Sequence, residues 1–303
     1  MKNKKTAGHI AILITNIIFG LNTVISRTIT PDIVSPFTLS FCRMTGAMIL
    51  FWTVSLFTKK EKVSLKDIGL LALTSLFALV FNQIPFIMGL SKTSPVDASI
   101  ILTILPIVSM LLAALFLKEP ITVKKTAGVM IGAGGALLLI LSQHKGGLGS
   151  GSTLGNLIII GSVLSYSIYL TLFKPIVTKY SPVTAMKWMF LFATIISLPI
   201  CYGDVAATDW ASLTLSAYLR IGYVVIFATF ITYFLIPVSQ KVLRPTTISM
   251  YNYLQPIVGA IIAVALHLDS FGWEKLLSGG LVFLGVYLVT RSKSREQVER
   301  DES

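Results

Sequence analysis

The sequence has few charged residues for its length. Only 13% of its 303 residues are Asp, Glu, Lys or Arg, whereas 54% are hydrophobic and the mean hydropathy is +0.81; a soluble domain usually carries about 25% charged residues. Cysteine is also scarce, and Cys42 and Cys201 lie inside apolar segments without a CxxC or Cys/His spacing. The sequence therefore argues against a water-soluble domain, a disulfide framework and a metal site, and we expect neither a metal nor a cofactor.

Catalytic and nucleotide-binding motifs are absent as well. The sequence contains no HExxH, no GxSxG, no cluster of aspartates and no phosphate-cradling GxxxxGK[ST]. The three histidines, His9, His144 and His267, lie near the ends of apolar segments. We therefore expect no catalytic residues and regard a membrane-embedded enzyme as the least favoured class, and ATP hydrolysis would have to come from another protein.

The sequence does contain apolar runs that are long enough to cross a bilayer as helices, which takes about 20 residues. Short links join them, so no soluble domain is inserted between two runs. The runs predict an all-α integral membrane protein with ten transmembrane helices, at residues 8–26, 36–57, 68–89, 95–117, 124–142, 154–173, 183–201, 216–237, 245–268 and 273–291.

The basic residues are distributed unevenly over the links. If the N-terminus is inside and the runs alternate, the outer links hold only Arg27, Lys92, Lys145 and Lys275, and Arg43 and Arg220 lie within runs. The other nineteen of the 25 Lys and Arg residues then fall on the inside. Because short cytoplasmic loops accumulate Lys and Arg, this split predicts that both termini are cytoplasmic. It also accounts for the net charge of +12 without a nucleic-acid partner.

The run ILPIVSMLLAAL at residues 104–115 has a counterpart, LQPIVGAIIAVA, at 254–265. A constant shift of 150 residues aligns 94–139 with 244–289 and matches Pro95 with Pro245 and Gly135 with Gly285. This register places the fourth and fifth runs on the ninth and tenth, so the repeat unit is five helices, and an odd number inverts the second copy. We predict two inverted halves, residues 1–146 and 147–303, with a site near the midplane at their interface.

The segment at residues 94–140 resembles the fourth and fifth helices of EamA-type members of the drug/metabolite transporter superfamily. The pair Phe19-Gly20, where the family often has Trp-Gly, and Arg43 near the start of the second run agree with this resemblance. The features that carry it in the segment are Pro106, the turn Lys118-Glu119-Pro120 and the glycines Gly128, Gly132 and Gly135. The resemblance implies a ten-helix transporter with a cavity lined by helices 1, 3, 4, 6, 8 and 9.

Polar side chains within the apolar runs are the candidates for that cavity, because groups at this depth usually face a bundle interior or a water-filled path. They concentrate in the six helices that the resemblance implies. The alternative is that many of them only bond neighbouring helices. The candidate substrate-binding residues are Asn16, Asn22, Asn82, Gln83, Ser99, Thr103, Tyr166, Tyr169, Thr232, Tyr233, Asn252, Tyr253 and Gln255.

Three further features have both a structural and a functional interpretation. Pro106 and Pro256 lie at the centres of their runs, where proline kinks a helix, and each kink is also a candidate hinge. Gly128 and Gly132 form a GxxxG pattern that favours close helix packing over a substrate contact. Arg43 has a structural role, holds an external gate, or binds an anionic group of the substrate.

All thirteen acidic residues fall in loops, in tails or in the first or last turn of a run. A proton-coupled carrier usually buries a titratable group on its pathway, and none of these carboxyl groups is expected near the midplane. Asp97, two residues into the fourth run, is the one acid kept in reserve, although capping a helix explains it equally well. The sequence therefore favours facilitated transport or exchange.

Together these patterns favour a secondary carrier that exports small organic metabolites, with amino acids or related compounds as candidates, by alternating access. The alternative is a membrane channel or a lipid-handling protein, although no filter-like sequence is visible. The expected partners are a small-molecule substrate and the lipid bilayer, without nucleic acid. We expect a monomer or homodimer in the bacterial plasma (inner) membrane.

Overall fold

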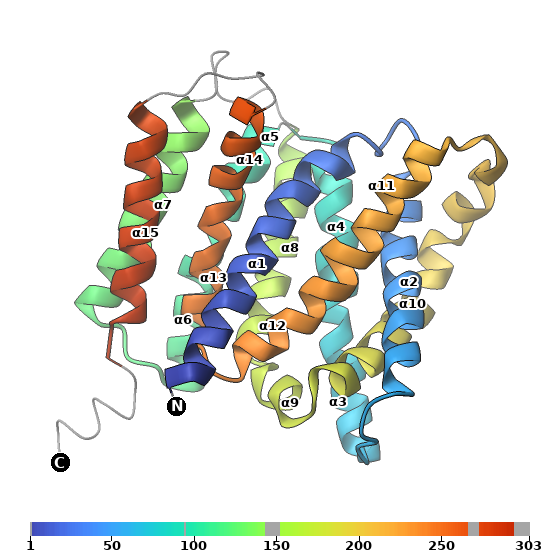
Figure 1. Ribbon diagram of the computed structural model, residues 1–303, viewed down its shortest axis with the longest axis horizontal. Coiled ribbons are helices and arrows are strands. Elements are labelled where there is room, and N and C mark those ends of the chain that lie inside the picture. Colours follow the sequence, from blue (N-terminus) through green and yellow to red (C-terminus); the bar gives the residue numbers. More distant parts are fainter. Residues whose placement is uncertain (1, 94, 143–151, 266–272, 294–303) are drawn as a thin grey trace.

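The computed structural model describes residues 2–93, 95–142, 152–265 and 273–293. The regular elements in these ranges are helices and helical turns (Figure 1), since in lipid a helix satisfies its own backbone hydrogen bonds. A short helix, α9 (Lys174–Lys179), and a 3₁₀ turn, η2 (Trp210–Ser212), join spans. The ten spans are α1 (Lys2–Arg27), α2 (Pro36–Ser55), α3–η1–α4 (Leu65–Ser75, Leu76–Val80, Phe81–Leu90), α5–α6 (Pro95–Leu102, Leu105–Leu117), α7 (Val123–Ser142), α8 (Thr153–Thr171), α10 (Pro182–Ala207), α11–η3–α12 (Leu215–Val225, Ile226–Ile231, Thr232–Gln240), α13–η4–α14 (Pro245–Met250, Tyr251–Tyr253, Leu254–Ala265) and α15 (Trp273–Thr290).

The helix lengths agree with the predicted spans. Within the described residues, nine stretches are long and apolar enough to cross a membrane. The remaining predicted span, 245–268, is divided into α13, η4 and α14, and its last three residues lie outside the described part of the chain. Helix α10 continues past its predicted end at residue 201 to Ala207. The only glycine in that extension is Gly203, and one glycine weakens a helix by about 1 kcal/mol without ending it.

Large apolar side chains cover the outside of the bundle. Ile10 and Leu13 of α1, Leu111 and Leu115 of α6, and Phe283 of α15 are all exposed. An apolar surface of this extent would promote aggregation in water, but it matches the acyl chains of a bilayer. The chain is a multi-pass membrane protein.

Hydroxyl side chains begin several spans, and they do so at related positions in the two halves. Ser35 and Ser181 precede a proline and accept hydrogen bonds from the third backbone N–H of α2 and α10. Ser64 and Thr214, which are 150 residues apart, cap α3 and α11 in the same way. These caps satisfy N–H groups that a helix start leaves without partners, so the short sequence signals fix where the spans begin.

The two halves also share their helix irregularities, again 150 residues apart. The third span widens into the π-helical segment η1, and the eighth span widens into η3. The fourth span is interrupted at Thr103 and Ile104, whose N–H groups bond three residues back, and the ninth is interrupted at η4. A proline follows each interruption, Pro106 or Pro256, which lacks an N–H and crowds the preceding turn.

Equivalent spans run in opposite directions. In Figure 1, α5 lies above α6, whereas α13 lies below α14. The same view places the beginning of α1 and the end of α15 at one face of the bundle. The fold is therefore two inverted five-helix repeats that form one bundle. The predicted boundary between residues 146 and 147 lies outside the described residues.

The fifth and tenth spans, α7 and α15, pack backbone against backbone. A Cβ atom added to Gly128 would lie 2.8 Å from the Gly285 carbonyl oxygen, and one added to Gly285 would lie 2.6 Å from the Gly128 oxygen. A Cβ on Gly132 would meet the Tyr253 ring at 2.9 Å. The prediction that Gly128 and Gly132 serve packing is confirmed, because any side chain larger than hydrogen separates these helices.

Candidate functional site

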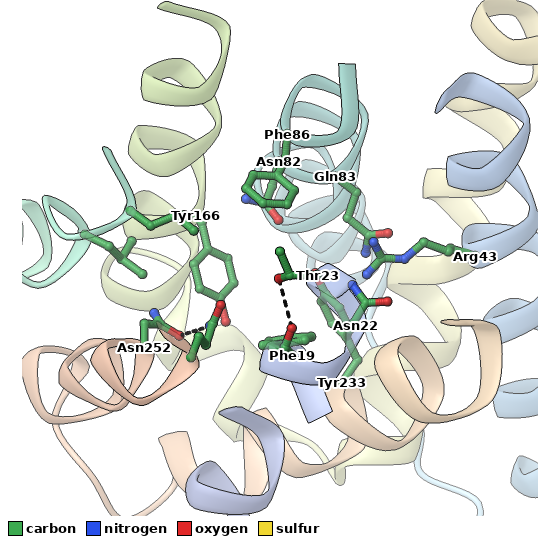
Figure 2. Close-up of a pocket in the computed structure, with 13 residues that line it drawn as sticks. Phe19, Asn22, Thr23, Arg43, Asn82, Gln83, Phe86, Tyr166, Tyr233 and Asn252 are labelled. Atoms are coloured by element: carbon green, nitrogen blue, oxygen red, sulfur yellow. Dashed lines mark hydrogen bonds between the residues drawn. The ribbon is translucent and has the colours of Figure 1, made fainter. Parts of the chain in front are cut away.

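A cavity of about 100 Å³ lies between the two halves (Figure 2). Amide, hydroxyl and aromatic groups make up most of its wall, together with one guanidinium group, and none of the described residues that line it is acidic. The lining residues are Phe19, Asn22, Thr23, Arg43, Asn82, Gln83, Phe86, Leu102, Leu105, Tyr166, Tyr233, Asn252 and Gln255.

An amide chain forms one wall of the cavity. The Gln255 Nε2 donates to Asn16 Oδ1 and to Asn252 Oδ1, each at 3.0 Å, and so links α1 to the ninth span. Asn16 lies behind this wall, fully buried, and its own Nδ2 donates to the Ile12 carbonyl. Close packing of α1 on α14 at Gly20, where an added Cβ would lie 2.8 Å from Val258, brings these amides together.

Asn82 joins the third span to the sixth. Its Nδ2 donates to the Ser162 carbonyl at 3.2 Å and to the Ser162 hydroxyl at 3.1 Å, and that hydroxyl donates back to the Asn82 carbonyl at 2.9 Å. Asn82 therefore has a structural partner as well as a place in the cavity wall. Tyr166, one turn along α8 from Ser162, faces the cavity from the same side.

Arg43 enters the cavity wall from α2 with only 5% of its surface exposed. Its Nε donates to the Thr229 hydroxyl at 2.9 Å, and its Nη2 donates to the Ala228 carbonyl at 3.4 Å. Both partners are neutral and belong to the π-helical segment η3. No carboxylate of the described residues lies within 4.0 Å of Arg43, since the ion pairs there are Lys125–Glu119 and Lys179–Asp67.

Tyr233 and Gln83 lie next to one another in the same region of the wall. The Tyr233 hydroxyl donates to the Ala78 carbonyl at 3.1 Å, and Ala78 belongs to the π-helical segment η1. Gln83 is 3% exposed; its amide lies beside the Tyr233 hydroxyl, but neither its nitrogen nor its oxygen makes a hydrogen bond of ordinary geometry in the described structure. A buried polar pair without partners is uncommon in native proteins and indicates a ligand or water site.

The other predicted candidates do not line the cavity. Ser99 is half-buried in α5, and Tyr169 is fully buried with its hydroxyl donating to Gln240 at 3.4 Å. The Thr232 hydroxyl donates to the Ala228 carbonyl, and the Thr103 hydroxyl donates to the Ile100 carbonyl. Tyr253 donates to the Thr103 carbonyl at 2.9 Å. Tyr169 and Tyr253 therefore join neighbouring spans, whereas Thr103 and Thr232 bond the backbone of their own span.

Several lining residues were not among the predicted candidates. Thr23 and Phe86 each lie close in sequence to a predicted residue, and the Thr23 hydroxyl donates to the Phe19 carbonyl. Leu102 and Leu105 flank the interruption of the fourth span, close to the kink that Pro106 predicts from the sequence. Among the described residues, no group of three or more His, Cys, Asp and Glu side chains could hold a metal ion.

Comparisons with known proteins agree with this architecture. A WAT1-related protein of Arabidopsis thaliana is 22% identical over 98% of this chain and 87% of its own length. The uncharacterized transporter YcxC of Bacillus subtilis is 25% identical over 94% of this chain and 93% of its own. A protein of known crystal structure has a TM-score of 0.75 at 15% identity, covering 95% of this chain and 97% of that protein. This last likeness shows the fold alone.

The comparison with protein families matches each half of the chain by itself. The model of the EamA-like transporter family matches residues 6–141 and, a second time, residues 153–291. Each match covers five spans, and the two together cover most of the sequence. The chain is a membrane transporter, and it belongs to the EamA-like transporter family.

Proposed function

We infer that this transporter is a secondary carrier that exports small organic metabolites across the bacterial plasma membrane by alternating access. The observation that carries the proposal is the cavity at the interface of two inverted halves, to which both halves contribute amide and hydroxyl groups. A site at the interface of inverted repeats can open to either side when one half rocks against the other.

The interrupted spans supply the parts that move. The Tyr253 hydroxyl, in the interruption of the ninth span, donates to the carbonyl of Thr103, in the interruption of the fourth. A helix that is broken at Pro106 or Pro256 can tilt on either side of the break without losing its regular hydrogen bonds. We propose these two positions as coupled hinges beside the cavity.

The cavity volume limits what this conformation can hold. Its ≈ 100 Å³ lies below the roughly 300–1,000 Å³ that is usual for small-molecule sites. An apolar cavity of about 150 Å³ accommodates benzene. We propose that the substrate is a small metabolite and that its entry and release require the walls to separate.

We propose that transport is facilitated or proceeds by exchange, and that both termini are cytoplasmic. The support for the first point is that no acidic side chain of the described residues lines the cavity. The support for the second is the uneven distribution of Lys and Arg over the links.

Counterflow in vesicles that contain the purified protein tests the proposal. Vesicles loaded with an unlabelled metabolite mixture should take up a labelled member of that mixture faster than empty vesicles, because a carrier exchanges substrate across the membrane. Asn252→Leu and Tyr166→Leu should lower this exchange about tenfold or more while leaving the folded yield intact. The control is Leu115→Ala, at an exposed position on the lipid face.

Two outcomes would contradict the proposal. Flux without stimulation by internal substrate indicates a channel. Equal loss of folded yield and exchange in both variants shows that these side chains serve packing.

A further inference from the structure

We propose that Arg43 is the anion-binding residue of the cavity. The substrate is then a small organic carboxylate that is transported in a form with a net negative charge. This inference rests on the proposed carrier function and names the substrate class of the same site. It comes from the partners of Arg43, from a comparison of equivalent carbonyl groups in the two halves, and from the groups that surround the guanidinium.

The first observation is a buried cation whose partners are all neutral. Arg43 is almost fully buried, and its hydrogen bonds go to the Thr229 hydroxyl and the Ala228 backbone carbonyl. An arginine cannot lose its charge in a protein, and a buried charge is costly unless it is paired. The cavity that Arg43 lines is the place where a counter-charge can be supplied.

The second observation is that the structural role of Arg43, its hydrogen bond to a carbonyl of η3, does not require an arginine. The carbonyls of Ala78 and Ala228 occupy equivalent positions in η1 and η3, because they are 150 residues apart. The Ala78 carbonyl accepts its side-chain hydrogen bond from the neutral hydroxyl of Tyr233. The Ala228 carbonyl already accepts a bond from the Thr232 hydroxyl at 3.0 Å. A neutral donor is therefore sufficient to satisfy such a carbonyl in a π-helical segment, and this hydrogen bond does not require the positive charge of Arg43.

The third observation is that the amide nitrogens of Asn22 and Gln83 lie beside the Arg43 guanidinium without a hydrogen-bond acceptor of ordinary geometry in the described structure. Figure 2 shows the Arg43 guanidinium, the Gln83 amide and the Asn22 amide gathered at one side of the cavity. The Asn22 Oδ1 already accepts from the Ser26 hydroxyl at 3.1 Å, which leaves its nitrogen as donor. Neither amide atom of Gln83 makes a hydrogen bond of ordinary geometry in the described structure, although the Tyr233 hydroxyl lies near.

These donors match the chemistry of a carboxylate. A guanidinium has five N–H donors, of which two are used here, and its planar fork can bind both oxygens of a carboxylate together. A carboxylate accepts hydrogen bonds and donates none, so it can accept from Arg43 and from the amide nitrogens of Asn22 and Gln83 together, and it leaves the Gln83 amide oxygen to another donor. The aromatic rings of Phe19 and Tyr166 and the amide of Asn252, across the cavity, contact the remainder of the substrate.

The negative charge of the substrate also determines the direction of net transport, because the membrane potential acts on it. The charge of Arg43 stays in the protein through a transport cycle, so each cycle moves the charge of the substrate alone. An inside-negative potential of about 100 mV favours a monovalent anion on the outside by roughly fifty-fold. Export of a carboxylate therefore proceeds without a proton site in the cavity.

Matched pairs of ligands test the anion site by binding, independently of transport. The probes are acetate with acetamide, lactate with lactamide, pyruvate with pyruvamide, and benzoate with benzamide, added to the purified full chain during thermal unfolding. At least one carboxylate should stabilise the protein at a concentration about tenfold lower than its amide, since hydrogen bonds to a charged group are the stronger ones. Equal stabilisation by both members of every pair, or by none, overturns the inference.

Two arginine variants locate the effect. Arg43→Gln should remove the preference for the carboxylate, and Arg43→Lys should weaken it, because an ammonium keeps the charge without the planar fork. Arg220→Gln removes a guanidinium that bonds the Thr28 carbonyl outside the cavity, and it should retain the preference. A preference that survives in Arg43→Gln overturns the inference.

Should Arg43→Gln fail to fold, the wild-type chain still decides the question. In vesicles, a potassium gradient with valinomycin imposes a membrane potential, and a potential that is positive inside should accelerate net uptake of the carboxylate into vesicles without internal substrate, but not of its amide. Carboxylate binding without any exchange contradicts the carrier proposal and leaves the anion site. Exchange of neutral compounds alone contradicts the anion site and leaves the carrier.

Discussion

The two faces of the bundle hold related junctions between its halves, but these junctions are built from different groups. At the face where α3 and α9 lie (Figure 1), Asp67 accepts hydrogen bonds from the Lys179 ammonium and the Tyr180 hydroxyl, each at 2.6 Å. Nearby, the Glu61 carboxylate accepts from the Ser181 N–H at 3.0 Å and from its hydroxyl at 2.9 Å. Charged groups therefore join the first half to the second at this face.

At the opposite face the position equivalent to Asp67 is neutral, because the residue 150 positions after Asp67 is Ala217. The side-chain bonds between the halves there include the Thr38 and Thr208 hydroxyls at 3.1 Å and the Arg220 guanidinium, which donates to the Thr28 carbonyl at 3.3 Å. The caps Ser64 and Thr214 are nevertheless alike. The duplication thus retains the local signals that start helices, while the groups that join the halves differ. We expect the two faces to separate with unequal ease.

Labelling of single cysteines assigns each junction to a side of the membrane and has the largest expected effect. In a chain whose Cys42 and Cys201 are replaced by serine, a cysteine at Ala206 should react with an impermeant reagent in intact cells. Cysteines at Lys62 and Lys179 should react only after the membrane is opened. The expectation follows from the Lys and Arg distribution, and the reverse pattern contradicts it.

The contact in which the halves are most alike is the backbone packing of α7 on α15. Gly285→Val should destabilise the fold by about 3 kcal/mol, because the added side chain meets a carbonyl that cannot move independently of its helix. Folded yield and the unfolding midpoint measure this loss. Gly134→Val is the control on the same helix as Gly128, since an added Cβ at Gly134 has no atom within 4 Å. Equal behaviour of the two variants contradicts the packing argument.

Asp67→Ala gives this position the residue found at its counterpart, Ala217. The variant loses the acceptor for Lys179 and Tyr180, so the cavity should open more often toward the α3 face. A cysteine at Tyr166 should then react several-fold faster with a reagent applied from that side, by the population-shift relation. Thr208→Ala, at the other face, should change this rate much less. An unchanged rate in Asp67→Ala shows that the Asp67 contacts do not hold the face closed.

Acid should weaken the Glu61 contact, with the smallest expected effect. Burial raises the pKa of the Glu61 carboxyl, but hydrogen bonds with Thr184 and Ser181 lower it, and the net pKa lies below its ordinary value. Because the folded-state pKa is lowered, the contribution is present at neutral pH and is lost as the pH falls through the folded-state value. Glu61→Gln should lower the unfolding midpoint by roughly 1 °C at pH 7, and the difference should vanish in acid. A difference that persists there contradicts the assignment.

The spans and the inverted repeat could be predicted because hydropathy and local start signals determine them. Asn22, Asn82, Tyr166 and Asn252 were recognised as cavity candidates because polar groups are rare within apolar runs. Tyr253 belongs to the same class of residue but bonds the Thr103 carbonyl behind the cavity. Which side of a span faces the cavity depends on how the helix is rotated, and neither the π-helical segments nor their effect on rotation is visible in the sequence.

The two π-helical segments set the helical phase of the cavity residues. An α-helix advances about 100° per residue, and a π-helical turn holds an additional residue, so the residues that follow it are rotated relative to those before it. In the third span all lining residues, Asn82, Gln83 and Phe86, follow η1, and in the eighth span Tyr233 follows η3. A deletion of one residue within η1 would leave composition and hydropathy nearly unchanged. It would nevertheless turn these three side chains away from the cavity, because that one residue determines the direction in which they point from the helix axis.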